Sequence, residues 1–402
     1  MLIGIDKFDK RPIDNCIEYT TYNFSEKLYN PCDTAFVIYE IINDENIKLI
    51  SNIKDEKYIY PVCVKFIGHA LGCIVHRDVN PVRVVDKTFL DFISKKALND
   101  IQMGVTKLLV YQPYEGNNIH QDSLFAVYDV FKQELVRKKI PVENVIYSDA
   151  NVLLNEESNI NDIKLVVVNH CANTVHMFNN TQKQNLYHGS HEESIKNRKL
   201  WEDSKNQIRD KYFLCYNRQP KSHRKKMVEW LKSFGYLDSG LVSLSPDLIL
   251  DIVDDPIVDK FSNIDTVISH YLDTYFTICT ETNYDDRNES GNAVLLSEKI
   301  WKPITNFHPF ILVSNAKSLN KLKEYGFKTF EPFIDESYDN INDKDKRFLA
   351  ICREIEKLCN KPIEEIHEWY WSIEEILKHN YYHFYNEFVP NEKQRFLNEI
   401  QL

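Results

Sequence analysis

A Ser-Glu-Lys triplet, residues 297 to 299, has the residue types of a site that binds an anion. It lies in NAVLLSEKIWKPITNFHPFILVS, which reads as a helix followed by an apolar strand. Ser297 is a suitable N-cap, with Asn292 as the alternative, and Glu298 suits the positive end of the helix dipole. Lys299 does not suit it, because that end repels a cation. The mismatch indicates an anionic partner such as a phosphate for Lys299, unless the side chain simply extends its charge into solvent.

CYNRQPKSHRKK, residues 215 to 226, is a second stretch with phosphate-binding chemistry. Arg218 lies in the predicted strand-to-helix loop and Arg224 in the first turns of the helix. The N–H groups and the dipole at a helix N-terminus attract phosphate, and Arg adds planar donors for bidentate contacts. A solvated basic helix face is the alternative, and we favour it for the two lysines that follow. For Arg224 we favour an anion site, because the Lys299 segment has matching chemistry.

The elements that would position these residues alternate between strands and helices. Apolar, β-rich runs alternate with helical patterns throughout the first half of the chain. This alternation is typical of a doubly wound parallel sheet. The predicted strands lie within 34–42, 58–68, 106–112, 144–149 and 163–168, and the predicted helices within 87–104 and 123–140.

A polar stretch at 180–210, which reads as a loop and an exposed helix, separates this half from a second α/β half. We predict two Rossmann-like domains that face a cleft, residues 1–205 and 206–365, and a helical tail, 366–402, that packs back on the first domain. In the second half we predict strands from 211, 274 and 309, helices within 222–235, 245–255, 264–273, 316–327, 344–359 and 363–388, and a short strand and loop within 328–341.

Carboxylates directly after apolar strands are candidates for a general base, because ligands of open α/β sheets lie beyond the carboxyl ends of the strands. Glu115 follows LLVYQPY and precedes Gly116, where the backbone can turn sharply. Asp149 ends VIYSD. The alternatives are an exposed loop acid for Glu115 and an Asx turn for Asp149. His170, after KLVVVN, could orient an acceptor or a sugar, or could be a buried structural histidine.

Polar residues after the predicted strand YFTIC could line the same cleft as the two anion-binding stretches. They are Glu281, Asn283 and Tyr284. The chain has no convincing DxD motif, and the pairs Asp254-Asp255 and Asp285-Asp286 read as turn or solvated acids. We therefore expect no metal ion and no tightly bound cofactor.

Two of these stretches resemble a known enzyme family. LLSEKIWKPI and HPFILVS resemble the Thr-Glu-Lys motif of the family 10 fucosyltransferases, which opens a helix in their C-terminal, nucleotide-binding domain. FLCYNRQPKSHRKKMVEWLKSFGYLDSG is similar to the segment of that family in which an Arg begins a helix and a turn with Asp and Gly follows. The resemblance spans residues 211 to 315. GFKTFEPFIDESYD is similar to a segment of glycosyltransferase-like proteins of phages and large viruses.

The resemblance implies roles for individual residues. Arg224 and Lys299 would bind the diphosphate of a nucleotide-sugar donor, and Glu298 would contact its ribose. Ser297 replaces the family's Thr and keeps the hydroxyl. A Glu in a strand-exit loop is the family's proposed base, and Glu115 matches it in position. The donor would be a nucleotide-diphosphate sugar, with a guanosine diphosphate sugar such as GDP-fucose as the family's example; the residues that hold fucose are not matched here, so the sugar stays open.

The chemistry of sugar transfer fits these side chains. Transfer passes through an oxocarbenium-like state while negative charge grows on the leaving diphosphate. Fixed cations and helix N–H groups stabilise that charge without a metal ion, and a carboxylate on the opposing domain deprotonates the acceptor hydroxyl. We therefore predict a metal-independent, inverting glycosyltransferase of the GT-B type.

Composition limits the classes of partner and the cellular compartment that we expect. The net charge of −11 argues against binding of nucleic acid or membranes by bulk charge. The nine cysteines form no CxxC pair, which argues against a disulfide framework or a zinc site. We find no signal peptide and no apolar run of membrane-spanning length, so we expect a cytoplasmic protein, in the host cytoplasm if it is viral or from a phage.

Other functions remain as alternatives. The acceptor could be a glycan, a protein or a modified base in phage DNA, although a DNA acceptor would need a basic cleft and the chain offers only the clusters at 197–199 and 221–226. A non-catalytic module on a degenerate transferase fold would bind a glycan or a protein. A different α/β enzyme would use the same phosphate site. The chain lacks a P-loop, a GxGxxG motif and a nucleophile elbow, and its sequence does not predict an oligomeric state.

Overall fold

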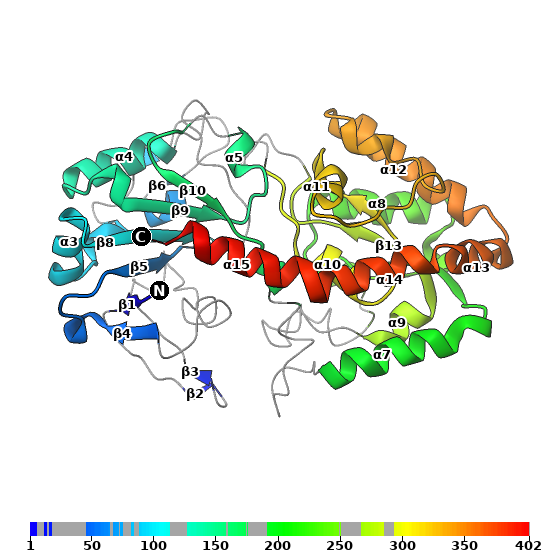
Figure 1. Ribbon diagram of the computed structural model, residues 1–402. Helices are drawn as coiled ribbons and strands as arrows, with labels where there is room; N and C mark the ends of the chain where they lie inside the picture. Colours follow the sequence, from blue (N-terminus) through cyan, green and yellow to red (C-terminus); the bar gives the residue numbers. More distant parts are fainter. Residues whose placement is uncertain are drawn as a thin grey trace. The chain divides into compact units, whose positions relative to one another are not determined.

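The computed structural model forms two units (Figure 1). The first comprises Met1–His170, Asp286–Leu295 and Asn391–Leu402, and the second Cys171–Asp285 and Leu296–Pro390. The domain limits predicted at residues 205 and 365 stay predictions. The residues that the structure describes are 1–5, 12–13, 16–17, 46–64, 67–71, 73–74, 82–83, 88–112, 127–157, 160–173, 175, 191–248, 250, 267–284 and 293–401.

A parallel sheet of six strands lies in the first unit, in the order β10-β9-β8-β5-β1-β4. β4 follows β1 in the chain and pairs on one side of it, whereas β5 pairs on the other side. The direction in which the chain crosses the sheet therefore reverses between β1 and β5. The strands are β1 (Ile3–Ile5), β4 (Ile47–Leu49), β5 (Tyr58–Cys63), β8 (Thr106–Gln112), β9 (Val145–Asp149) and β10 (Lys164–Val167).

Four of the five predicted strands of this half are confirmed: they are β5, β8, β9 and β10. The predicted strand at 34–42 lies outside the described residues. The sequence patterns do not predict β1 and β4. Two antiparallel pairs are also described in this unit, β2 (Pro12–Ile13) with β3 (Cys16–Ile17) and β6 (Cys73–Ile74) with β7 (Val82–Arg83).

Helices of the first unit are held to the sheet by buried side chains and caps. Ser94 caps α3 by accepting a hydrogen bond from the Ala97 N–H at 3.3 Å, and Ala97 and Ile101 are buried. Near the C-terminus Arg395 donates to the main-chain oxygen of Val167 at 3.0 Å. The helices are α2 (Ile67–Ala70), α3 (Lys95–Gln102), α4 (Val127–Arg137), α5 (Leu154–Glu157) and α15 (Val389–Glu399), of which the first two residues belong to the second unit.

The second unit contains a parallel sheet of four strands in the order β12-β11-β13-β14. β12 pairs on one side of β11 and β13 on the other, so the chain reverses its direction across the sheet between β11 and β13. Gly240 begins β12 where a Cβ would lie 2.3 Å from the Phe213 ring. The strands are β11 (Lys211–Cys215), β12 (Gly240–Val242), β13 (Thr274–Thr280) and β14 (Phe310–Val313).

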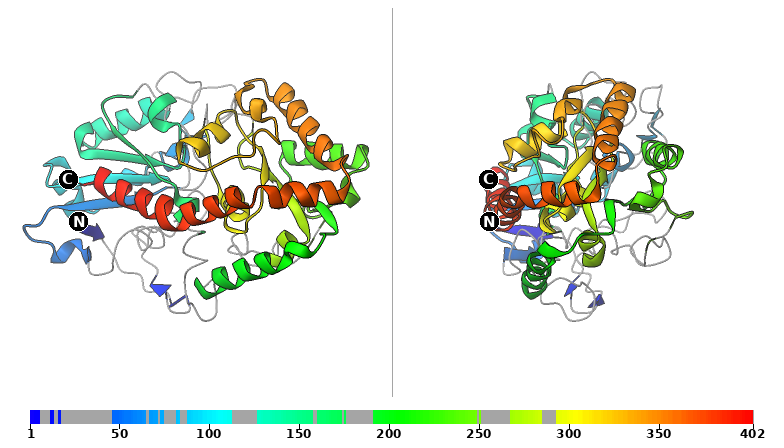
Figure 2. Two further views of the ribbon diagram at one scale, coloured as in Figure 1. Left: turned by 45° about the vertical axis from the view of Figure 1, so that its right-hand side comes forward. Right: turned by 90° about the vertical axis from the view of Figure 1, so that its right-hand side faces the viewer.

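The reversal determines on which face of this sheet the helices lie. Crossovers between parallel strands are right-handed, so the two that leave β11 and β13 in opposite directions place α8 and α10 on opposite faces. Figure 2 shows the helices of this unit from two further sides. The helices are α7 (His191–Asp203), α8 (Ser222–Ser233), α9 (Ile268–Leu272), α10 (Glu298–Thr305), α11 (Ser318–Glu324), α12 (Lys344–Cys359), α13 (Ile363–Ser372) and α14 (Glu374–His383), with a π-helical turn at Phe384–Phe388.

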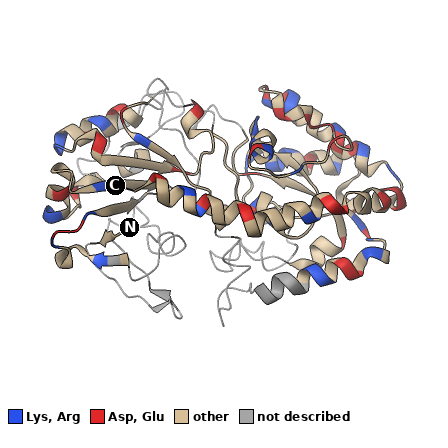
Figure 3. Ribbon diagram, viewed as in Figure 1, with Lys and Arg blue, Asp and Glu red and all other residues tan. Residues whose placement is uncertain are grey.

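An aromatic core holds the C-terminal helices of the second unit. The Trp201 ring stacks on Phe307 with centroids 4.1 Å apart, and Phe307 stacks on Tyr381 at 4.4 Å. The indole N–H of Trp201 donates to the Tyr370 hydroxyl, which donates to the main-chain oxygen of Phe307, both at 2.7 Å. Along the ribbon, Lys, Arg, Asp and Glu positions are more frequent in the helices than in the strands of either sheet (Figure 3), as expected for buried parallel strands.

Two predicted elements are wrong in the described residues. The helix predicted within 245–255 begins instead as a turn over 245–247, closed by the bridge between Leu244 and Leu248; 249 and 251–255 lie outside the described residues. The short strand predicted within 328–341 is absent there, because the Glu336 carboxylate takes the Phe330 N–H and the Thr329 hydroxyl at 2.7 Å each. A side chain that binds the local backbone competes with strand pairing in this way. Among the described residues, no helix is long and apolar enough to cross a membrane.

Candidate functional site

A pocket in the second unit lies at the reversal between β11 and β13. This is the place where open α/β sheets bind ligands, because the loops that leave the two strands diverge there. Its walls come from the exit of β11, from β13 itself and from α9 and α10. The lining residues are Tyr216, Arg218, Tyr271, Thr277, Ile278, Cys279, Thr280, Glu298, Lys299 and Lys302.

The N-terminus of α10 is placed at the pocket by a cap and a buried face. Ser297 is the N-cap, and its hydroxyl accepts the Lys299 N–H at 3.3 Å. The alternative cap, Asn292, lies outside the described residues. A helix of eight residues is marginal by itself. Ile300 and Trp301 are fully buried, and burial of such side chains contributes about 1.5–3 kcal/mol each, so packing fixes where this end points.

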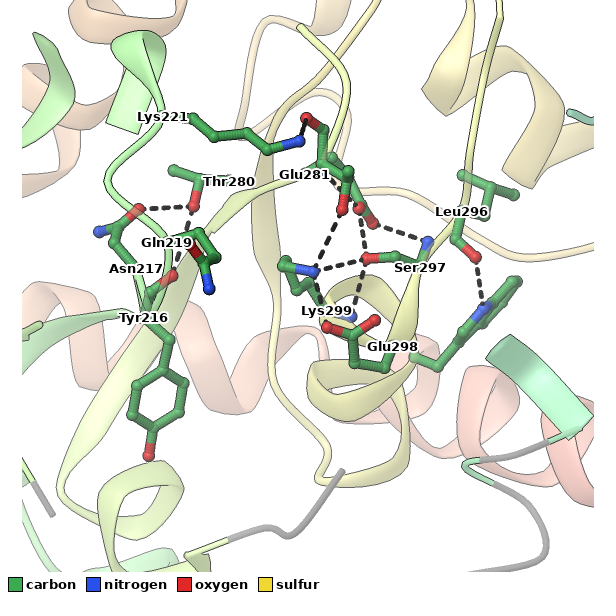
Figure 4. Close-up of polar contacts among 12 residues, drawn as sticks. Tyr216, Asn217, Gln219, Lys221, Thr280, Glu281, Leu296, Ser297, Glu298 and Lys299 are labelled. Atoms are coloured by element: carbon green, nitrogen blue, oxygen red, sulfur yellow. Dashed lines mark hydrogen bonds and ion pairs between the residues drawn. The ribbon is translucent and has the colours of Figure 1, made fainter. Parts of the chain in front are cut away.

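The anion that faces Lys299 in this structure is the carboxylate of Glu298. The Lys299 ammonium lies 2.6 Å from Glu298 Oε1 and 3.1 Å from the Ser297 hydroxyl (Figure 4). Burial and Arg224 disfavour the Lys299 ammonium, but Glu298 and Glu281 together outweigh these effects, and the pKa of Lys299 lies above its usual value. Burial likewise disfavours the carboxylate, yet Lys299 and Lys302 lower the pKa of Glu298 to about 2. Both groups are therefore charged at neutral pH.

Arg224 is fixed behind the pocket rather than on a solvated helix face. Its side chain is 2% exposed. Its guanidinium donates at 3.2 Å to the main-chain oxygens of Gln219, Thr280 and Glu281, at the exits of β11 and β13. Burial lowers the pKa of Arg224, against the opposing effect of Glu298. Its buried Nε has no hydrogen-bond partner among the described residues.

Glu281, predicted to line the cleft, is buried behind Ser297 and is 0% exposed. Its carboxylate accepts hydrogen bonds from the Ser297 N–H at 3.1 Å, the Thr282 N–H at 3.2 Å and the Ser297 hydroxyl. Burial raises the pKa of Glu281 above its usual value, against the opposing effect of Lys299. Tyr284 is also buried, with its hydroxyl on the main-chain oxygen of Lys344 at 2.6 Å. Asn283 is half-buried between the two.

The sequence patterns missed Lys302. It lines the pocket although it is only 6% exposed. Its place was implied by spacing, because residues three apart on a helix share a face and Lys299 is already there. With Arg218, which is half-buried at the β11 exit, three cations line the pocket against one carboxylate, Glu298.

The candidate bases of the first unit are placed differently. Glu115 lies outside the described residues. Asp149 is 0% exposed and accepts hydrogen bonds from Gln112 Nε2 at 2.7 Å, the Tyr147 hydroxyl at 2.8 Å and the Asn151 N–H at 2.8 Å. The last contact is an Asx turn, so this placement favours the structural alternative. His170 is buried, which lowers its pKa to about 4 and keeps the ring neutral at pH 7.

The acidic pairs of the sequence do not enter the described site. Asp254-Asp255 and Asp285-Asp286 lie outside the described residues. Within the described part of the chain, no group of three or more His, Cys, Asp or Glu side chains is placed to hold a metal ion.

Comparison with known proteins gives a weak structural likeness. No protein-family model and no curated protein matches the chain. A crystal structure of alpha1,3-fucosyltransferase with GDP-fucose matches with a TM-score of 0.32 and 10% identity, over 67% of this chain and 75% of that one. A crystal structure of alpha1,3-fucosyltransferase with GDP matches with a TM-score of 0.33 and 10% identity, over 84% and 95%. At these values we base the interpretation of the site on the chain's own residues.

Proposed function

We propose that the chain is a glycosyltransferase whose second unit binds the diphosphate of a nucleotide-sugar donor. One observation carries the proposal: Arg218, Lys299 and Lys302 line a single pocket, together with the N-terminal turn of α10, at the reversal of a parallel sheet. Cations, a helix N-terminus and a strand-exit crevice together form a site suited to phosphates. The resemblance of residues 211–315 to the family 10 fucosyltransferases favours a nucleotide sugar over other phosphorylated ligands.

The proposed mechanism follows from where charge develops. As the bond between sugar and phosphate breaks, negative charge grows on the leaving diphosphate, and preorganised cations stabilise that charge. Lys299 and Lys302 would act there directly, while Arg224 would fix the exits of β11 and β13 from behind the pocket. As in the sequence-based prediction, we propose that transfer inverts the configuration of the sugar and needs no metal ion. We also propose a GT-B organisation in which the first unit supplies the acceptor site. Glu115 is the proposed base, since Asp149 is fully buried in this structure.

Donor and acceptor are proposed more broadly. A guanosine diphosphate sugar is the first donor to test, with fucose as the first sugar, because the Arg224 and Lys299 segments resemble the enzymes that use it. A glycan or a protein is the proposed acceptor. The net charge of −11 gives no reason to place DNA first.

Thermal unfolding with a panel of nucleoside diphosphates, nucleotide sugars and inorganic pyrophosphate tests the proposal. A ligand at 100 times its Kd adds about 2.7 kcal/mol to the stability of the state that binds it. Lys299→Ala should weaken binding by roughly 10- to 150-fold, the equivalent of one charge-assisted hydrogen bond, and remove most of the stabilisation. The matched control is Lys361→Ala, which removes a lysine of the same unit that is ion-paired to Glu365 at 3.2 Å.

Each outcome decides something different. Stabilisation of the wild type and the control, lost in Lys299→Ala, supports the diphosphate site. Stabilisation by pyrophosphate alone would indicate another phosphate-using protein. No stabilisation of a well-folded wild type by any of these compounds would refute the proposal. Release of the nucleoside diphosphate from a stabilising donor then separates a transferase from a binding module.

A further inference from the structure

The main chain of Glu281 joins two elements at the exit of β13. Its N–H donates to the main-chain oxygen of Val313 at 3.0 Å, which continues the pairing of β13 with β14. Its own main-chain oxygen accepts hydrogen bonds from Arg224 Nη2 at 3.2 Å and His223 Nε2 at 2.9 Å. The first turns of α8, including the buried cation Arg224, are therefore attached to the main-chain oxygen of Glu281.

The side chain of Glu281 reaches the other arm of the site. Its carboxylate accepts from both the N–H and the hydroxyl of Ser297 (Figure 4). The same hydroxyl accepts from the Lys299 N–H at 3.3 Å and from the Lys299 ammonium at 3.1 Å. A hydroxyl has one donor and two acceptor positions, and all three are used here. Ser297 thus connects the Glu281 carboxylate to Lys299.

The pattern of donors explains why a carboxylate stands at this buried position. One oxygen of Glu281 accepts the Ser297 N–H, and the other accepts the Thr282 N–H. A carboxylate accepts at both oxygens, whereas the amide of Gln would turn an NH₂ group toward one of these N–H groups. A buried donor left facing another donor loses its hydrogen bond and keeps the cost of desolvation.

We propose that Glu281 is a positioning residue that holds Arg224 and Lys299 in register for the ligand's diphosphate, through its main-chain oxygen and through Ser297, without touching the ligand. The inference rests on the proposed function and adds to it. The sequence resemblance implies that Arg224 and Lys299 bind the diphosphate. The hydrogen bonds indicate that Glu281 holds these two cations in place. Affinity for a diphosphate therefore depends on a carboxylate outside the pocket wall.

The test measures the Kd of inorganic pyrophosphate, and of the nucleotide from the panel that stabilises the wild type most, for a set of variants. Glu281→Gln should raise the Kd about 10-fold or more, the equivalent of one misplaced charged hydrogen bond. Ser297→Ala should raise it similarly, and Ser297→Thr, which keeps the hydroxyl, should restore it. The double variant Glu281→Gln/Ser297→Ala should be little weaker than either single variant, since both break the same connection.

Glu336→Gln is the matched control. Glu336 is also a buried carboxylate of the second unit, and it accepts from a hydroxyl and a main-chain N–H, those of Thr329 and Phe330. Its variant should lose stability like Glu281→Gln but keep the wild-type Kd within about 2-fold, because Glu336 does not line the pocket and sites that share no partners act independently. A Kd that rises equally in both variants would show that general destabilisation is the cause and would overturn the inference.

The outcomes separate the inference from the function it builds on. A wild type that binds no diphosphate refutes both. A wild type that binds, with Glu281→Gln binding equally well, refutes only the positioning role. If Glu281→Gln fails to fold, Ser297→Ala decides alone: loss of affinity that Ser297→Thr restores supports the role, and unchanged affinity overturns it.

Discussion

Replacing Glu298 by Gln tests the electrostatics of the site most directly. The substitution keeps the shape of the side chain and removes the charge that lies 2.6 Å from the Lys299 ammonium. The Glu298 side chain is 21% exposed, so the pair is shielded without being cut off from water. It also stands in the first turn of α10, where a negative charge suits the helix dipole.

The size of the effect follows from the pKa of Glu298. Lys299 and Lys302 lower it from 4.5 to about 2, even though burial acts in the opposite direction. A shift of about 2.5 units at about 1.36 kcal/mol each gives an upper bound of roughly 3.4 kcal/mol. Because partly exposed ion pairs are worth less than such a bound, we expect Glu298→Gln to lower the free energy of unfolding by about 1–2 kcal/mol at pH 7.

The pH dependence has a definite sign. A carboxylate whose pKa is lowered in the folded state contributes stability that is present above its unfolded pKa of 4.5 and is lost as the pH falls toward about 2. The difference between wild type and Glu298→Gln should therefore be constant above about pH 5 and should shrink below it. Glutamine does not titrate, so the change arises in the wild type.

Urea unfolding followed by tryptophan fluorescence is the suitable assay. All five tryptophans, Trp201, Trp230, Trp301, Trp369 and Trp371, lie within the residue bounds of the second unit, so the signal reports the unit that holds the site. Measurements from pH 7 down to pH 3 give the free energy of unfolding of both proteins. A difference that stays the same at every pH, or no difference at pH 7, would refute the reasoning.

The same variant separates two roles of Glu298 in binding. Its carboxylate occupies the Lys299 ammonium, so its removal should tighten binding of inorganic pyrophosphate several-fold. A nucleotide that also needs Glu298 for its ribose should gain less or lose affinity. Weaker pyrophosphate binding in Glu298→Gln would show that the carboxylate orients Lys299 rather than competing for it.

Two further substitutions test how the acids and cations are held. Lys cannot reproduce the planar group with which Arg224 donates to three main-chain oxygens. We therefore expect Arg224→Lys to lower the free energy of unfolding by about 2 kcal/mol, roughly 4–8 °C in Tm by tryptophan fluorescence, and to weaken diphosphate binding. An unchanged Tm would contradict this placement of Arg224. Asp149→Asn turns an NH₂ group toward one of the donors around that carboxylate, so we expect calorimetry to show a loss of about 1–3 kcal/mol while donor binding is kept. Full stability with loss of sugar transfer would instead identify Asp149 as the base.

The strands that the sequence predicts are those with long apolar runs. β8 and β13 are seven residues long and almost wholly buried, and continuous β-rich runs are typical of parallel strands covered on both faces. β1 and β4 have three residues each, too few for a periodic signal. The order of the strands has no local signal either. It depends on pairing between distant segments, and the reversals beside β1 and β11 emerge only in the folded chain.

In the site, too, local features could be predicted from the sequence and long-range contacts could not. Ser297, Glu298 and Lys299 could be singled out because helix ends have known chemical preferences, which act within a few residues. The role of Glu281 could not, because its partner Ser297 is 16 residues away along the chain. From the sequence, Glu281 is correctly predicted to follow a strand, but it is also predicted to line the ligand cleft. In the structure its oxygens are all engaged by donors of the protein.

The two units differ in the charge they present at their strand exits, and this difference is why the proposal puts the donor on the second. In the first unit the described exits of β8, β9 and β10 carry Gln112, Asp149 and Asn169, hydrogen-bonded to neighbours in the same unit. In the second unit the exits of β11 and β13 carry Arg218 and Glu281, with Arg224 and Lys299 held beside them. A diphosphate needs fixed positive charge, and an acceptor hydroxyl needs hydrogen bonds and one accessible carboxylate. Exchange of donor and acceptor between the units would leave the phosphates facing two amides and the Asp149 carboxylate, and the hydroxyl facing cations.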